Sequence, residues 1–160
     1  MPESFVQGLD SQIQQQMVDL LNDRVADGID LALAVKQAHW NLKGRGFIGV
    51  HELLDDAVAR LRDGNDLMAE RAVIMGGFAK GTSQVVADKT TLEPYPVEMT
   101  DIQEHVTHLV KRYKDFGAKL RAAIDAAGEA GDEDTADLFT EVSRTVDKDC
   151  WFIGANLPRD

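Results

Sequence analysis

The stretch "KQAHWNLKGRGFIGVHELLDD", residues 36–56, predicts a helix end, a glycine-broken turn and a helix start. Apolar residues before and after the turn recur every three or four positions, which is typical of amphipathic helices. The turn is short, so the two helices are expected to form an antiparallel hairpin. One histidine, His39, precedes the turn, whereas His51 and Asp55 follow it.

Apolar residues recur every three or four positions in four long segments of the chain. We therefore expect helices over residues 10–42, 47–75, 100–128 and 132–158. Thr100 and Gln103 resemble a capping box at the start of the third helix. Gly128 is expected to end that helix, and Pro158 is expected to stop the fourth.

A long connection, residues 77–99, separates the second and third helices and suits a crossover along the bundle, with a short helix near residues 82–88. One long crossover distinguishes ferritin-like bundles among the four-helix types. The predicted fold is therefore all-α: a ferritin-like four-helix bundle with a long crossover carrying a short helix between helices 2 and 3. We expect a single domain over residues 1–160, with a short N-terminal extension at residues 1–9.

The charge of the chain is strongly acidic, with 17 Lys and Arg against 28 Asp and Glu and a formal net charge of −11. Such a surface attracts cations and repels nucleic acid and anionic membranes. The only cysteine, Cys150, excludes an intrachain disulfide and a multi-thiolate metal site. No apolar run approaches the ~20 residues of a membrane span, and the N-terminus lacks the features of a signal peptide. We therefore expect a cytoplasmic protein.

Two pairs of candidate metal ligands lie on the second helix. His51 and Asp55 are four residues apart, as are Asp66 and Glu70, so each pair shares a helix face. At about 100° per residue both pairs point the same way, but they lie about 16 Å apart along the axis. A metal ion with bonds of about 2 Å cannot be held by both pairs of one chain.

Two interpretations remain open from spacing alone. Either the pairs are unrelated solvated side chains, or the second helix packs antiparallel on its own copy across a two-fold axis and forms two shared sites. His39, near the end of the first helix, is expected beside His51 if the chain turns at "KGRG", residues 43–46. Histidine with carboxylate suits Fe(II), Mn(II) or Zn(II). No Glu-x-x-His motif of an intra-bundle di-iron site is present, which favours a shared site.

The remaining histidines, His105 and His108, are three residues apart on the third predicted helix. This spacing can chelate a metal, but neither histidine has a carboxylate partner. We expect both side chains to face solvent.

Three stretches resemble the Dps family, the DNA-binding proteins from starved cells, also called mini-ferritins. They are residues 36–56, the segment "DLMAERAVIMGG" and the segment "DTADLFTEVSRTVDKDCWFIGANL". The resemblance extends from about Leu20 to Leu157. It implies a hollow dodecamer with ferroxidase centres at two-fold interfaces.

The resemblance also implies a ligand set. His39, His51 and Asp55 match the ligands that one subunit supplies, and Asp66 and Glu70 match those of its neighbour. Iron is expected to bind there as Fe(II), to be oxidised preferably by hydrogen peroxide, and to be stored as ferric mineral, which protects against oxidative stress. Zinc is a possible surrogate for iron.

Other positions also match the family. Trp40 resembles a tryptophan close to the centre, where it either intercepts oxidising equivalents or packs at the interface. Asp132, Asp137 and Glu141 match acids that line an iron-entry pore; alternatively, acids at a helix start stabilise the helix dipole.

DNA binding is where the sequence departs from the family. DNA-binding members commonly use a lysine-rich tail, whereas the first Lys or Arg here is Arg24. Phosphate contacts supply most sequence-independent affinity, so we expect no direct DNA binding. The alternative functions are a nucleoid-packing protein for which iron oxidation is secondary, and a structural bundle with zinc or no metal.

Overall fold

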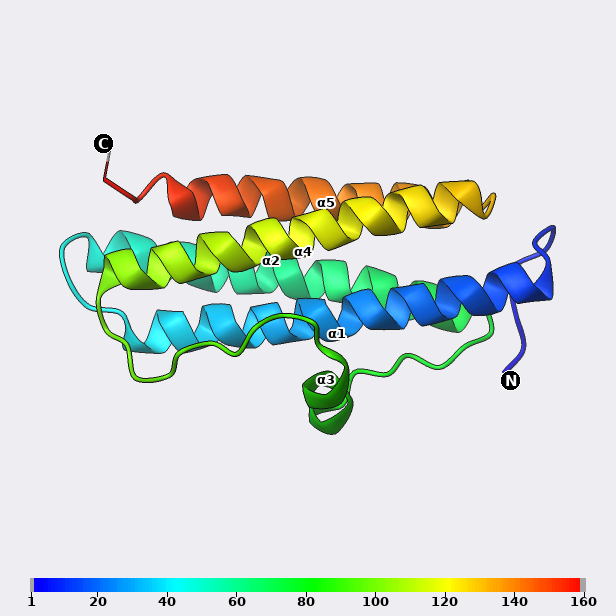
Figure 1. Ribbon diagram of the computed structural model, residues 1–160, viewed down its shortest axis with the longest axis horizontal. Helices are drawn as coiled ribbons and strands as arrows, with labels where there is room; N and C mark the ends of the chain where they lie inside the picture. The colour runs from blue at the N-terminus through cyan, green and yellow to red at the C-terminus, as the bar shows by residue number, and fades with distance from the viewer. Residues whose placement is uncertain (1, 159–160) are drawn as a thin grey trace.

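Four long helices packed side by side dominate the computed structural model, which describes residues 2–158 (Figure 1). In chain order the helices are α1 (Ser11–Asn41), α2 (Phe47–Ile74), α3 (Ser83–Lys89), α4 (Ile102–Glu129) and α5 (Glu133–Gly154). Within this range the only β-type pairing is an isolated parallel bridge between Lys43 and Asp101. The predicted all-α bundle and the short helix in the crossover are therefore confirmed.

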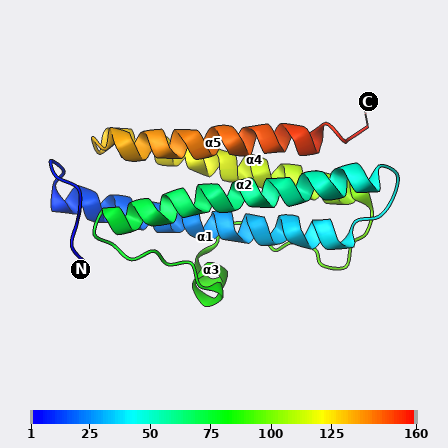
Figure 2. The ribbon, with the colours of Figure 1, turned by 180° about the vertical axis from the view of Figure 1, so that it is seen from behind.

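The bundle consists of two antiparallel hairpins, α1–α2 and α4–α5, joined by the crossover that carries α3 (Figures 1 and 2). The crossover returns along the side of α1, where α3 packs. As a result the α1–α2 turn, the start of α4 and the end of α5 lie at one end of the bundle, and the N-terminal segment lies at the other. In the described range no helix is both long and apolar enough to cross a membrane.

The core forms where the apolar stripes of the long helices meet. Leu21, Leu54, Phe116 and Phe139, one from each long helix, are fully buried. Burying a side chain of this size contributes about 1.5–3 kcal/mol, so the stripes provide the main driving force for packing. On α4 the apolar residues that recur every three or four positions from Ile102 to Leu120 are buried, as expected for one face of an amphipathic helix.

The predicted capping box at Thr100 and Gln103 is wrong by one position. Asp101 is the N-cap of α4, and its carboxylate accepts a hydrogen bond from the Glu104 amide (3.0 Å). The reason is a tertiary contact: the Thr100 carbonyl accepts the Lys43 amide hydrogen (2.7 Å), which keeps the backbone extended through Asp101.

The last helix ends at Gly154, earlier than the predicted stop at Pro158. The Asn156 side chain donates hydrogen bonds to the carbonyls of Phe152 (2.9 Å) and Ile153 (3.1 Å). These bonds satisfy carbonyl groups that the next helical turn would otherwise use, so the helix stops before the proline.

A buried ion pair joins the two hairpins. Asp149 of α5 is fully buried, and Arg60 of α2 donates to its carboxylate at 2.8 Å. Burial raises the pKa of Asp149, and the hydrogen bond from Arg60 opposes this rise. Arg60 therefore keeps a buried carboxylate paired.

We expect Arg60→Met to lower the free energy of unfolding by about 3–5 kcal/mol at neutral pH, because a buried charge loses its partner. Without Arg60 the pKa of Asp149 rises further, so the carboxyl is neutralised at a higher pH. The loss should thus shrink as the pH falls from about 8 to about 5. Urea unfolding at fixed protein concentration measures both effects, with the exposed Arg62→Met as the control. An equal loss in the two variants would contradict the assignment.

Candidate metal centre

The α1–α2 turn brings His39 and His51 into direct contact. The two imidazole rings stack with centroids 3.7 Å apart and an interplanar angle of 17°. Gly44 and Gly46 in the turn have positive φ angles of 134° and 80°, a conformation that glycine adopts readily and that lets the chain reverse tightly. The predicted proximity of the two histidines is confirmed.

Reciprocal hydrogen bonds orient the two rings. His39 Nδ1 is 2.7 Å from the His51 carbonyl oxygen, and His51 Nδ1 is 2.9 Å from the His39 carbonyl oxygen. A carbonyl oxygen only accepts, so each Nδ1 carries the hydrogen and each Nε2 keeps its lone pair. Metal-binding histidines are usually oriented in this way, by a hydrogen bond from the other ring nitrogen.

Asp55, one helical turn after His51, adds a carboxylate to this pair. Its Oδ1 lies 4.0 Å from His39 Nε2, and its side chain is 57% exposed. The same oxygen accepts a hydrogen bond from Lys36 Nζ. This hydrogen bond is the largest cause of a lowered pKa at Asp55. A cation that binds Oδ1 of Asp55 therefore competes with Lys36, a participant that the sequence analysis missed.

Asp66 and Glu70 are not brought to this cluster. Both are exposed on α2, and the rise of the helix separates even the nearest members of the two pairs, Asp55 and Asp66, by about 16 Å. Within residues 2–158 of one chain, no three His, Cys, Asp or Glu side chains are grouped so that they could hold a metal ion. A single chain thus carries two separate halves of the predicted ligand set.

A groove over α1 and α2 lies beside Asp66, and its lining includes none of His39, His51 and Asp55. Its volume is about 470 Å³, and Lys36 and Trp40 of α1 line it together with Asp66 of α2. Trp40 is 67% exposed and packs against little of its own chain. The acidic half of the ligand set therefore borders the same open surface as Lys36, the partner of Asp55.

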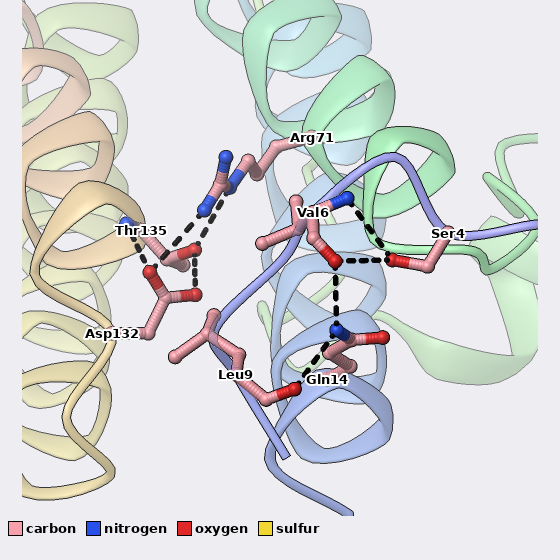
Figure 3. Close-up of polar contacts among 7 residues, drawn as sticks. All are labelled: Ser4, Val6, Leu9, Gln14, Arg71, Asp132 and Thr135. Atoms are coloured by element: carbon pink, nitrogen blue, oxygen red, sulfur yellow. Dashed lines mark hydrogen bonds and ion pairs between the residues drawn. The ribbon is translucent and has the colours of Figure 1, made fainter. Parts of the chain in front are cut away.

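The three predicted pore acids separate in the structure. Asp132 is buried at the start of α5, where it accepts hydrogen bonds from the Thr135 amide (3.1 Å), the Thr135 hydroxyl and Arg71 (3.2 Å; Figure 3). In the single chain Asp132 is the N-cap of α5, in agreement with the alternative interpretation that acids at this position stabilise the start of the helix. Asp137 and Glu141 are exposed one turn apart on α5.

The expectation for His105 is wrong: its side chain is only 1% exposed, whereas His108 is partly exposed. Tyr95 Oη lies 2.6 Å from His105 Nδ1, and His105 Nε2 lies 2.8 Å from the Met99 carbonyl oxygen. The sequence does contain a signal for this burial, because His105 falls three residues after Ile102 in the apolar stripe of α4.

Comparisons with known proteins agree with this architecture. A family model described as the ferritin-like domain matches residues 18–159. The chain is 46% identical to the DNA protection during starvation protein of Agrobacterium fabrum, over 93% of this chain and 92% of that protein. It is 32% identical to a protein of the same name from Mycolicibacterium smegmatis, over 95% of this chain and 82% of that protein.

Solved structures extend the likeness to three dimensions. DpsA14 from Streptomyces coelicolor matches with a TM-score of 0.93 and 32% identity, over 99% of this chain and 94% of that chain. The tetragonal form of Mycobacterium smegmatis Dps matches with a TM-score of 0.92 and 31% identity, over 96% and 94% of the two chains. The predicted ferritin-like fold is thereby confirmed.

The reciprocal hydrogen bonds predict the tautomers of His39 and His51. Both rings should be in the Nδ1–H form in the metal-free protein at a pH where they are neutral, because each Nδ1 faces a carbonyl oxygen. Nitrogen chemical shifts of histidine-labelled protein report the tautomer. His108, outside this contact, serves as the internal reference. An Nε2–H signal from either stacked ring would contradict the geometry.

Replacing Lys36 should remove the hydrogen bond that its ammonium group donates to Asp55. In Lys36→Gln, we expect the pKa of Asp55 to rise towards its ordinary value of 3.8, because the hydrogen bond that lowers it is lost. Carboxyl-carbon NMR titration of aspartate-labelled protein measures the change. The control is Lys119→Gln, which removes an exposed ion pair to Asp115 elsewhere (2.8 Å) and should leave Asp55 unchanged. An unaltered titration of Asp55 in Lys36→Gln would exclude this role for Lys36.

Proposed function

The chain belongs to the Dps family of ferritin-like proteins, and from this membership we propose that it is a ferroxidase and iron-storage protein. In this proposal two copies of the chain share each centre, Fe(II) is the substrate, and hydrogen peroxide is the preferred oxidant. Ferric mineral is stored inside a hollow dodecamer, which protects the cell against oxidative stress.

The observation that carries the proposal is the oriented pair of His39 and His51 beside Asp55. The hydrogen bonds of both Nδ1 atoms leave the Nε2 atoms of the neutral rings as donors to a metal, and Asp55 adds an exposed carboxylate 4.0 Å from His39 Nε2. In one chain these groups are only part of a metal site. Asp66 and Glu70, the other half of the ligand set, lie too far along α2 to join them in one chain. A second copy, related by a two-fold axis, supplies the missing half.

The surface of α2 supports this pairing. An antiparallel register that places His51 opposite Glu70 of a second copy also places Asp55 opposite Asp66. The same register brings Ile48 to the level of Val73, two apolar side chains that are 61% and 45% exposed in one chain. Apolar surface of this kind is typical of a contact between proteins, so one register serves both the ligands and the packing.

The donor set suits the oxidation of iron. Imidazole nitrogens bind Fe(II), and carboxylates favour the harder Fe(III) that forms. Two Fe(II) ions give one electron each, and one hydrogen peroxide molecule takes both electrons and two protons to form two water molecules. This stoichiometry avoids the hydroxyl radical that a one-electron reaction in free solution would release. Zinc, which accepts the same ligands, is a surrogate without redox chemistry.

Entry of iron depends on the acidic surface. We assign Asp137 and Glu141 as the solvent-facing carboxylates of an entry pore, since both are exposed on α5. Carboxylates repeated around a narrow channel concentrate cations. Asp132 supports this pore by holding the start of α5, because its own oxygens are engaged by Thr135 and by Arg71, whose charge compensates the carboxylate.

Direct DNA binding is not part of the proposal. Residues 2–10 contain no Lys or Arg, and this segment is tied to the bundle. Phe5 donates its amide hydrogen to the Ile74 carbonyl (2.9 Å), and the Gln14 side chain donates to the carbonyls of Val6 (3.3 Å) and Leu9 (3.2 Å; Figure 3). Both the charge and the mobility that phosphate contacts need are missing here. A shift of DNA in a gel at low salt and neutral pH would instead support the nucleoid-packing alternative.

Complementation between variants tests the shared centre. His39→Ala and Asp66→Ala should each slow peroxide-driven Fe(II) oxidation at least about tenfold, because each removes a ligand. When the two variants are co-assembled, one centre in each mixed pair regains all its ligands. Random mixing should then restore about a quarter of the wild-type rate, since half of the pairs are mixed.

Stopped-flow absorbance under anaerobic conditions measures this rate, and the wild type should consume two Fe(II) ions per peroxide molecule. The control mixes the two variants after separate assembly, which should restore nothing. If co-assembly also restores nothing, or if either single variant oxidises iron at the wild-type rate, the shared centre is wrong.

A further inference from the structure

His105 of α4 forms two hydrogen bonds with the end of the crossover. The hydroxyl of Tyr95 donates to His105 Nδ1 (2.6 Å), and His105 Nε2–H donates to the Met99 carbonyl (2.8 Å). Burial raises the pKa of Tyr95 and lowers the pKa of His105, so the phenol keeps its proton and the imidazole stays neutral. The donor and acceptor roles of both bonds follow from these protonation states.

The Tyr95 ring is fixed from other sides as well. The Arg112 guanidinium lies 4.9 Å from the ring centroid, within the range of a cation–π contact. Arg112 also donates to the Glu93 carbonyl, so it holds the chain two residues before the tyrosine. His108 meets the ring edge-on, with centroids 6.2 Å apart. The two hydrogen bonds of His105 thus complete a well-supported attachment, which we call the Tyr95–His105 clasp.

The segment held by the clasp is itself bonded to the hairpin that carries the two metal-binding histidines. The Gln37 side chain donates to the Val97 carbonyl (3.3 Å), and the Lys43 amide donates to the Thr100 carbonyl (2.7 Å). His39 lies between Gln37 and Lys43 in the chain. Figure 1 shows the end of the crossover and the α1–α2 turn at the same end of the bundle.

The start of α4 also packs directly under the turn. Asp101 forms the isolated bridge with Lys43, and the buried Ile102 side chain lies 3.6 Å from where a side chain on Gly44 would begin. His105 is one helical turn away, and its own amide donates to the Asp101 carbonyl (3.0 Å). A displacement of residues 95–101 would therefore remove the outer support of the turn.

We propose that the Tyr95–His105 clasp positions the α1–α2 turn so that His39 and His51 keep their reciprocal hydrogen bonds. Tyr95 and His105 are then positioning residues for the metal centre, which they do not touch. This inference rests on the proposed function only for its consequence for metal binding. The effect on the turn itself is independent of any metal.

The test removes one hydroxyl. Tyr95→Phe keeps the ring and its contact with Arg112 but loses the bond to His105. The matched control is Tyr113→Phe, because Tyr113 lies buried on α4 and its hydroxyl has no hydrogen-bond partner within residues 2–158. Hydrogen–deuterium exchange of the metal-free, fully assembled protein is followed by mass spectrometry on peptides covering residues 37–46. Loss of one hydrogen bond should speed exchange there about two- to tenfold in Tyr95→Phe only.

A second measurement separates positioning from general stability. Co(II) alone is titrated as the probe, and its affinity and visible absorption bands are recorded. We expect about two- to tenfold weaker binding and altered bands in Tyr95→Phe, with wild-type behaviour in Tyr113→Phe. His105→Gln, which can still accept and donate, should retain more of the wild-type Co(II) spectrum than His105→Leu, which can do neither.

The outcomes are distinct. Unchanged exchange over residues 37–46 in Tyr95→Phe would overturn the clasp, and so would a uniform rise over the whole chain. Faster exchange of the turn with unchanged Co(II) binding would overturn its role at the centre. Failure of the wild type itself to bind Co(II) would count against the proposed function, while the exchange measurement would still decide whether the clasp supports the turn.

Discussion

Helix α2 runs without a break from Phe47 to Ile74, and this keeps the two pairs of candidate ligands of one chain apart. A straight helix rises about 1.5 Å per residue, so side chains near its two ends cannot meet. His51 and Asp55 lie near the start of α2, and Asp66 and Glu70 lie farther along the same face. One chain therefore presents two incomplete halves of a ligand set. In the proposed function, two such helices packed antiparallel would join unlike halves at both ends, so the centre would require assembly.

Contacts between residues far apart in the sequence orient His39 and His51, which belong to one of these two halves. Stacking of His39 on His51, with each Nδ1 directed at the other residue's carbonyl, couples the end of α1 to the start of α2. The turn between them is in turn supported by Thr100 and Asp101 of the crossover. The turn that holds the two imidazole rings is thus in contact with a segment about sixty residues away in the sequence, which the long crossover brings back to this end of the bundle.

Several charged groups of this acidic chain have two roles. Lys36 pairs with Asp55 and lowers its pKa, so the carboxylate beside the two histidines is compensated by a basic group. Asp132 caps the start of α5 through Thr135, and the Arg71 guanidinium compensates its buried charge. Arg60 keeps Asp149 paired between α2 and α5. Basic groups are thus placed where carboxylates would otherwise be buried or crowded.

The amino-acid sequence alone predicts the four long helices, the crossover with its short helix, the hairpin that joins His39 to His51, and the separation of the two carboxylate-bearing pairs along α2. These features follow from local periodicity and the fixed rise of a helix, which need no knowledge of distant residues. Three features depend on how the helices pack and are seen only in the folded chain. They are the pairing of Lys36 with Asp55, the capping of α5 by Asp132, and the burial of His105. The same applies to the start of α4 at Asp101. A polar side chain has several potential partners of similar strength, and the one that it obtains depends on which segments packing brings within about 3 Å of it.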